Sequence, residues 1–152
     1  MKFPTCFSKS LIFSEMNFDN IIDDFQFLDN WEDKYKYIID MGNSLSTLKS
    51  IDYNDHNKVE GCASQVWLVV EEIDKQGKTL LKFTGDSDAF IVKGLIAIIF
   101  ALFSEKTPSE ILEIDPMSEL KKLNLEENIS QQRSNGLTAM INRVFSEAKK
   151  RI

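Results

Sequence analysis

Apolar residues recur at helical spacing in the first part of the chain. One such run predicts an amphipathic helix over about residues 17–28. A second helix is predicted after Asn30, because asparagine is a favoured N-cap, and Gly42 fits the C-terminal stop of this helix. The apolar face of the second helix consists of Trp31, Tyr35, Ile38 and Ile39.

The pattern changes to that of β-strands in the middle of the chain. Residues 65–70 and 79–83 are rich in β-branched and aromatic side chains, and residues 74–77 fit a hairpin turn between them. Val59 is expected to add a short strand before Gly61. These segments predict a small antiparallel sheet of about three strands.

The last third of the chain is predicted to be helical. Its most apolar stretch, residues 89–103, contains Lys93 and is shorter than the roughly 20 residues needed to cross a bilayer, which favours a buried core helix. Asp86 or Ser87 is expected to cap this helix. Three further helices are predicted: one after the capping-box pattern of residues 107–110, one over residues 117–123, and one from a Ser130 cap to Lys149. The fold class is therefore α+β, with the sheet packed against several helices.

Composition favours one globular domain. The 152 residues are 43% hydrophobic, and the net charge of -6 disfavours nucleic acid as a partner. With only two cysteines, a disulfide framework is not expected, so a cytoplasmic setting is favoured, with an organelle stroma or matrix as the alternative. Residues 1–16 lack the features of a signal peptide and are interpreted as a flexible N-terminal extension of a domain that spans residues 17–152.

Chemistry is limited to few candidates. The sequence has no phosphate-binding or dinucleotide-binding glycine motif, and its single histidine, His56, cannot form a multi-histidine metal site. No cofactor or metal is therefore predicted. Free cysteines are usually buried and inert, yet Cys62 lies between a polar loop and a strand, directly after Gly61, which permits a tight turn. This position favours a projecting, reactive thiol.

Four sequence motifs stand out along the chain. The first, Asn57-x-Val59-x-Gly61-Cys62-x-Ser64-Gln65-Val66-Trp67, resembles the active loop of the SufE family, whose members accept sulfur from cysteine desulfurases. The other three keep the family order and spacing: N-W-E-D-K-Y over residues 30–35, G-D-S-D-A with I-V-K-G-L over residues 85–95, and R-S-x-G-L-x-A-M over residues 133–140. The N-terminal residues through Met16 match no motif, so Cys6 inherits no role.

This resemblance implies a fold shared with SufE and the IscU-type scaffolds, and a function in sulfur transfer. Cys62 would take persulfide sulfur from a pyridoxal-phosphate-dependent cysteine desulfurase, stimulate that enzyme, and deliver the sulfur to an iron–sulfur scaffold complex. The protein would be a transfer partner with a covalent cysteine persulfide rather than an independent enzyme. It would need no cofactor and no membrane. In the free protein, the thiol would be tucked against apolar neighbours, and the loop would open on docking.

Other residues are expected to support the loop or bind the partner: Gly61, Ser64, Gln65, Asp86 and Arg133. Arg133 is the cation favoured for stabilising the thiolate, with a surface or structural salt bridge as an equal alternative. His56 is a less favoured base. Asp86 and Asp88 fit helix capping better than a cation site, since a hard cation needs more oxygen ligands.

Three other functions are weighed against sulfur transfer. A docking module that stimulates a desulfurase without accepting sulfur should survive Cys62→Ser. An iron–sulfur scaffold usually needs about four thiolate or imidazole ligands, more than this chain offers. A peroxide-sensing thiol is disfavoured because no motif supplies a resolving cysteine.

Overall fold

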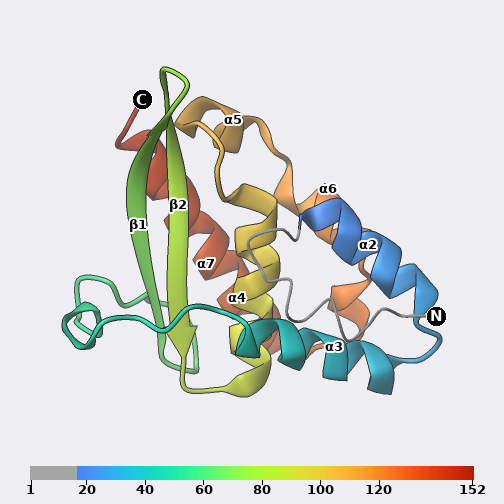
Figure 1. Cartoon of the computed structure of the whole chain (residues 1–152). Helices are drawn as coiled ribbons and strands as arrows, with labels where there is room; N and C mark the ends of the chain where they lie inside the picture. Colours follow the sequence, from blue (N-terminus) through green and yellow to red (C-terminus); the bar gives the residue numbers. More distant parts are fainter. Residues whose placement is uncertain (1–16) are drawn as a thin grey trace.

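The computed structural model describes residues 17–152, which form a two-stranded antiparallel hairpin with helices packed on one side of it (Figure 1). Strands β1 (Val66–Lys75) and β2 (Lys78–Ser87) pair along their full length. Gln76 and Gly77 form the turn with φ angles of 53° and 81°, the pair of positive values that a tight hairpin turn with the right twist requires. Both strands exceed their predicted lengths. Strand β1 continues through residues 71–75 toward the turn, where exposed polar side chains give no apolar alternation, whereas β2 gains most of its extra length at its other end, where residues 84–87 pair with residues 66–69.

The predicted third strand is reduced to a single bridge between Lys58 and Trp67. The amide of Val59 donates to the carbonyl of Val66 at 2.8 Å, and beyond this point the chain turns away at Gly61, whose φ is 94°. The α+β class is confirmed, but the sheet of the described residues has two strands instead of about three.

Helices α2 (Phe18–Phe27) and α3 (Trp31–Asn43) begin within one residue of their predicted starts. The N-cap predicted at Asn30 is confirmed, and Asn17, which was expected to begin the first helix, is the N-cap of α2. Gly42 was expected to end α3, but it lies within the last turn of that helix, against α4 (Phe90–Phe103). A Cβ at Gly42 would come 2.6 Å from the backbone nitrogen of Gly94, and a Cβ at Gly94 would come 2.2 Å from the carbonyl oxygen of Ile38. The two glycines therefore allow α3 and α4 to pack backbone against backbone.

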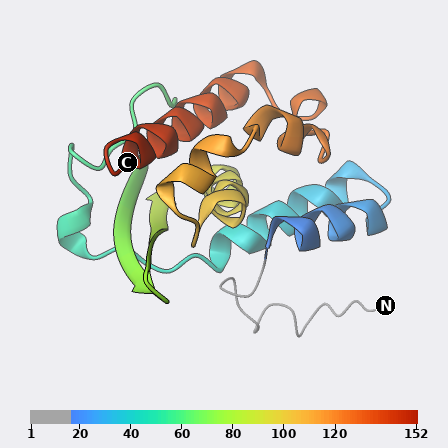
Figure 2. The ribbon, with the colours of Figure 1, turned by 90° about the horizontal axis from the view of Figure 1, so that it is seen from above.

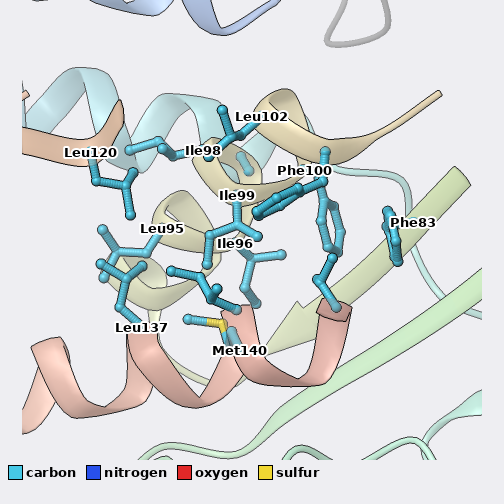
Figure 3. Packing of buried hydrophobic residues seen from close by; sticks show 14 of the residues in the cluster. Phe83, Leu95, Ile96, Ile98, Ile99, Phe100, Leu102, Leu120, Leu137 and Met140 are labelled. Carbon is cyan, nitrogen blue, oxygen red and sulfur yellow. The ribbon is translucent and has the colours of Figure 1, made fainter. Parts of the chain in front are cut away.

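Helix α4 is the centre of the fold. Viewed from above, it is seen nearly end-on, with α7 (Gln131–Lys149) on one side and α2 and α3 on the other (Figure 2). Its side chains meet those of β2, α6 (Pro116–Lys121) and α7 in one apolar cluster, as Figure 3 shows for Phe83, Leu95, Ile99, Leu120, Leu137 and Met140. The prediction of a buried core helix is confirmed. Over residues 17–152, none of the helices is both long and apolar enough to span a bilayer.

The start of α4 differs from the sequence prediction. Its N-cap is Ala89, which has no side chain to cap with; the hydroxyl of Ser87 accepts from the Ala89 amide at 3.2 Å, outside the capping position. Asp86 makes no capping contact with α4, because β2 extends to Ser87 and directs this carboxylate toward other partners, described below.

The remaining elements complete the helical layer. Helix α5 (Pro108–Glu113) begins with the predicted capping box, and α7 begins after Ser130, whose hydroxyl accepts from the Arg133 amide at 3.2 Å. Short 3₁₀ turns occur at Ser50–Asp52 and Leu125–Glu127. The predicted flexible extension, residues 1–16, lies outside the described residues.

Candidate functional site

The candidate site is a loop tip that carries Cys62 and rests on helix α7. The loop leaves the bridge at Val59, turns through Gly61 and Cys62, and returns to the sheet at Val66. A backbone φ of 94° at Gly61 is disfavoured for any residue with a side chain, so this glycine makes the turn possible. A Cβ there would also come 3.2 Å from the Cβ of Ala139 on α7.

The thiol of Cys62 faces helix α7. Its Sγ atom donates to the carbonyl oxygen of Gly136 at 3.6 Å, and a Cβ at Gly136 would lie at the same 3.6 Å from Sγ. The residue is partly buried, and burial raises the pKa of the Cys62 thiol above its ordinary value. The free protein therefore holds the neutral thiol rather than the thiolate at neutral pH.

A pocket of about 240 Å³ lies beside the thiol. Part of its lining is apolar, and the part at the N-terminal turn of α7 is polar. Arg133 belongs to this polar part, and its Nη1 donates to the hydroxyl oxygen of Tyr35 on α3 at 3.4 Å. The lining includes Cys62 and Ser64 from the loop, Val92 and Leu95 from α4, and Ser130, Arg133 and Met140 from the region of α7.

Gln65 closes the loop against the start of α4. Its amide donates to Asp88 Oδ1 at 3.1 Å and its side-chain Nε2 to Asp88 Oδ2 at 3.4 Å, while the Asp88 amide donates back to the Gln65 carbonyl at 3.3 Å. Both residues are exposed. Asp88 thus holds the loop where it rejoins the sheet, a role that the sequence did not predict.

Asp86 does not line the pocket of Cys62. Its carboxylate accepts from the hydroxyl of Tyr53 and from the Ser87 amide at 2.8 Å, and it lies 3.5 Å from Lys93 Nζ. Of the six site residues that the sequence singled out, Cys62, Ser64 and Arg133 line one pocket, Gly61 and Gln65 shape the loop, and Asp86 stands apart from the pocket.

The sequence analysis missed Arg143, which reaches from α7 to the loop before Cys62. Its Nη2 donates to the carbonyl of His56 at 2.8 Å and its Nη1 to the carbonyl of Lys58 at 3.1 Å. His56 itself is exposed and meets α7 through its backbone. The signal that could have found Arg143 was its position seven residues after Gly136, which places both on one face of a helix.

A metal centre is not formed by the part of the chain that the structure describes. Over residues 17–152, no group of three or more histidine, cysteine, aspartate or glutamate side chains is arranged to hold an ion. The carboxylate of Asp86 pairs with the ammonium group of Lys93, and that of Asp88 accepts hydrogen bonds from Gln65, as given above.

Comparison with known proteins identifies the family. The SufE model, described as an Fe-S metabolism associated domain, matches residues 19–148. The chain belongs to the SufE family. It therefore has a general role in Fe–S metabolism and sulfur transfer.

Two relatives agree with this family assignment, and one solved structure shares the fold. An uncharacterized SufE-like protein of Rhizobium meliloti is 50% identical over 134 residues, which cover 88% of this chain and 96% of the relative. A second one, of Rhizobium etli, is 50% identical over 133 residues, covering 88% and 90%. The solution structure of a hypothetical protein from Thermus thermophilus superposes with a TM-score of 0.64 over 88% of this chain and 93% of that one. At 20% identity, that likeness shows the shared fold alone.

Proposed function

We propose that this SufE protein accepts sulfur on Cys62 as a persulfide and hands it on for iron–sulfur cluster assembly. The thiolate of Cys62 attacks the outer sulfur of a persulfide held by a cysteine desulfurase. A new S–S bond forms on Cys62 as the donor's S–S bond breaks, and the donor cysteine leaves as a thiolate. Because one S–S bond forms as another breaks, the oxidation state of the transferred sulfur does not change, and the exchange needs no external oxidant or reductant.

The observation that carries this proposal is the placement of Cys62 at the tip of a turn that only Gly61 permits. A thiol that must reach into another enzyme's active site needs to project from its own fold, and a loop tip can project once it lifts from α7, against which Cys62 rests in the free protein. The Gly136 contact and the pocket beside it also give the sulfur a sheltered resting position. Shelter matters because persulfides, like thiolates, are readily oxidised when exposed.

The proposed partners follow from this chemistry. The donor is a pyridoxal-phosphate-dependent cysteine desulfurase that this protein stimulates, and the receiver is an iron–sulfur scaffold complex. The SufE protein brings no cofactor of its own, acts in a reducing compartment such as the cytoplasm, and binds neither nucleic acid nor membrane. Arg133 is proposed to stabilise the thiolate or the transferred sulfur, because it lines the same pocket as Cys62. Asp86, with Gln65 and Ser64, is proposed to contribute to docking or to support the loop.

Mass spectrometry under non-reducing conditions tests the proposal. The protein is incubated with the desulfurase of its own organism and cysteine, then alkylated and digested. One added sulfur is expected on the peptide that contains Cys62. Cys6→Ser serves as the matched control and should keep this signal, whereas Cys62→Ser should abolish it.

Two outcomes would overturn the proposal. Sulfur found on Cys6 alone would show that Cys62 is not the acceptor. Undiminished sulfide delivery by Cys62→Ser, with the desulfurase still stimulated, would leave the protein as a docking module without a covalent step.

A further inference from the structure

Arg143 joins the loop of Cys62 to helix α7 through two backbone carbonyls. Its Nη2 donates to His56 at 2.8 Å and its Nη1 to Lys58 at 3.1 Å, while its Nε donates to Glu147 Oε2 at 3.1 Å. The planar guanidinium presents its donors in a rigid fork, so these three contacts fix its orientation. The side chain is only 20% exposed, which limits competition from water.

Glu147 holds Arg143 from the far side. This carboxylate is 7% exposed and also accepts from Arg151 Nη1 at 2.9 Å, and Lys150 Nζ lies 3.5 Å away. Burial alone would raise the pKa of Glu147, but the hydrogen bonds from Arg151 and Arg143, together with the charge of Lys150, lower it below its ordinary value. Arg151 in turn binds Glu72 on β1 at 2.9 Å. The guanidinium of Arg143 is therefore held in place before it meets the loop.

The loop contacts of α7 lie along one side of that helix. Gly136 accepts from Cys62, Ala139 faces Gly61, and Arg143 binds the segment before them. Spacings of three, four and seven residues place these positions on one helical face. The loop tip, residues 61–62, and the segment before it, residues 56–58, thus contact the same face of α7. A shift of residues 56–58 therefore moves the tip.

We infer that Arg143 is a positioning residue that keeps the Cys62 loop closed and so sets how readily the thiol becomes accessible. Without it, the carbonyls of His56 and Lys58 lose their donor, and the loop has fewer bonds to break on opening. The link from this closure to sulfur transfer rests on the proposed function, but the closure itself is a property of the free protein. Arg143 does not touch the sulfur and acts only through the loop.

Alkylation of Cys62 in the free full-length protein tests the inference without a desulfurase. Arg143→Met keeps the aliphatic length and removes the donors, and the rate is followed across pH with iodoacetamide, in a Cys6→Ser background. We expect a rise of about tenfold, which corresponds to about 1.4 kcal/mol, near the lower end of what a hydrogen bond from a charged group contributes. The apparent pKa of the alkylation profile should also fall toward that of an exposed cysteine, because the thiol spends more time in water.

Lys150→Met is the matched control. It removes one positive charge near the same carboxylate, yet Lys150 touches no loop atom in the described contacts, so its alkylation rate and pH profile should match those of the parent. Arg143→Lys should recover only part of the closure, because a single ammonium group cannot reproduce the fork. Glu147 retains the hydrogen bond from Arg151 in all three variants, so the fold should survive.

Urea distinguishes loop opening from general unfolding. A local opening of the loop exposes little surface, so the alkylation rate should change little at low urea if the thiol reacts from that open state. If the thiol reacts only after global unfolding, the alkylation rate should rise with urea as steeply as the unfolding equilibrium does. An Arg143→Met profile identical to that of the parent would overturn the inference. So would a faster rate that follows global unfolding in urea. A failure of persulfide transfer in the parent would overturn the proposed function but would leave this result standing.

Discussion

Replacing Gly61 with alanine should increase the accessibility of Cys62 by straining the closed loop. The backbone φ of 94° at Gly61 lies outside the regions that an alanine adopts readily, and the added Cβ would lie 3.2 Å from the Cβ of Ala139. Such a conformation costs of order 1–3 kcal/mol in a residue with a side chain. An open loop is free to choose another φ, so the cost falls on the closed state alone.

The expected size of the effect follows from that strain. A penalty of about 1–3 kcal/mol changes an equilibrium by about 5- to 150-fold, so the open fraction and the alkylation rate should rise by that factor. The rate is measured with excess iodoacetamide at fixed pH, and global stability is measured by urea unfolding of the same sample.

Gly77→Ala provides the matched control for this experiment. Gly77 also has a positive φ, 81°, but a Cβ there would meet nothing within 4 Å. It lies in the hairpin turn, about 30 Å along β1 from the Cys62 loop at the usual rise per residue. Gly77→Ala should lower stability through the same backbone strain without changing alkylation. Equal alkylation rates in the two variants would refute the link between the Gly61 turn and thiol shielding.

Three further predictions concern stability measured by urea unfolding. Burial raises the pKa of the Cys62 thiol, so the neutral thiol stabilises the folded state fully below the pKa of the unfolded chain, and this stabilisation is lost as pH rises through the pKa of the folded state. The free energy of unfolding should therefore fall above pH about 9, and Cys62→Ser should make that fall less steep. The pKa of Glu147 is lowered in the folded state, so the stabilisation from its carboxylate is lost as pH falls through that lowered pKa. Glu147→Gln should reduce the free energy of unfolding by about 1–3 kcal/mol at pH 7. An equal reduction in acid would contradict this explanation. Gly94→Ala should reduce the free energy of unfolding by about 1–3 kcal/mol or more, since its Cβ would lie 2.2 Å from the Ile38 carbonyl oxygen. Unchanged stability would disprove the close packing of α3 on α4.

Local signals predicted the helices well because they depend on neighbouring residues. The N-caps at Asn17, Asn30 and Ser130 each bond an amide three residues later, a contact that sequence spacing alone can specify. Gly42 misled the prediction because its place depends on Gly94, far along the chain. The same sequence signal, glycine near the end of a helix, serves both a stop and a close helix contact.

The strands show a second limit of sequence prediction. The β1 segment from Glu71 to Lys75 is polar and mostly exposed, so no apolar alternation marks it as a strand, yet the hairpin register extends through it to Lys78. The expected third strand failed for a different reason. Val59 has the right character, but Gly61 turns the chain away after one bridge.

Within the site, motifs identified the thiol but could not describe its setting. Cys62 and Arg133, 71 positions apart, line one pocket, which a motif match can imply only through family resemblance. Arg143 and Asp88 make their loop contacts with backbone carbonyls and amides as well as side chains. Backbone groups carry no residue signature, so the spacing from Gly136 could place Arg143 on the loop side of α7, but only the folded structure shows which carbonyls it binds.

If Cys62 accepts sulfur as proposed, the closed loop creates a conflict that docking of the donor has to resolve. Attack on a persulfide requires the thiolate, but burial and the bond to the Gly136 carbonyl both favour the neutral thiol. Arg133 in the same pocket does not reverse this balance, since the pKa of Cys62 is raised and not lowered. Opening therefore changes both access and charge, and a partner that binds the open loop gains both effects at once. Because a partner shifts the loop only by its preference for the open form, the ratio of Cys62 alkylation rates with and without a non-reacting desulfurase variant measures that preference directly.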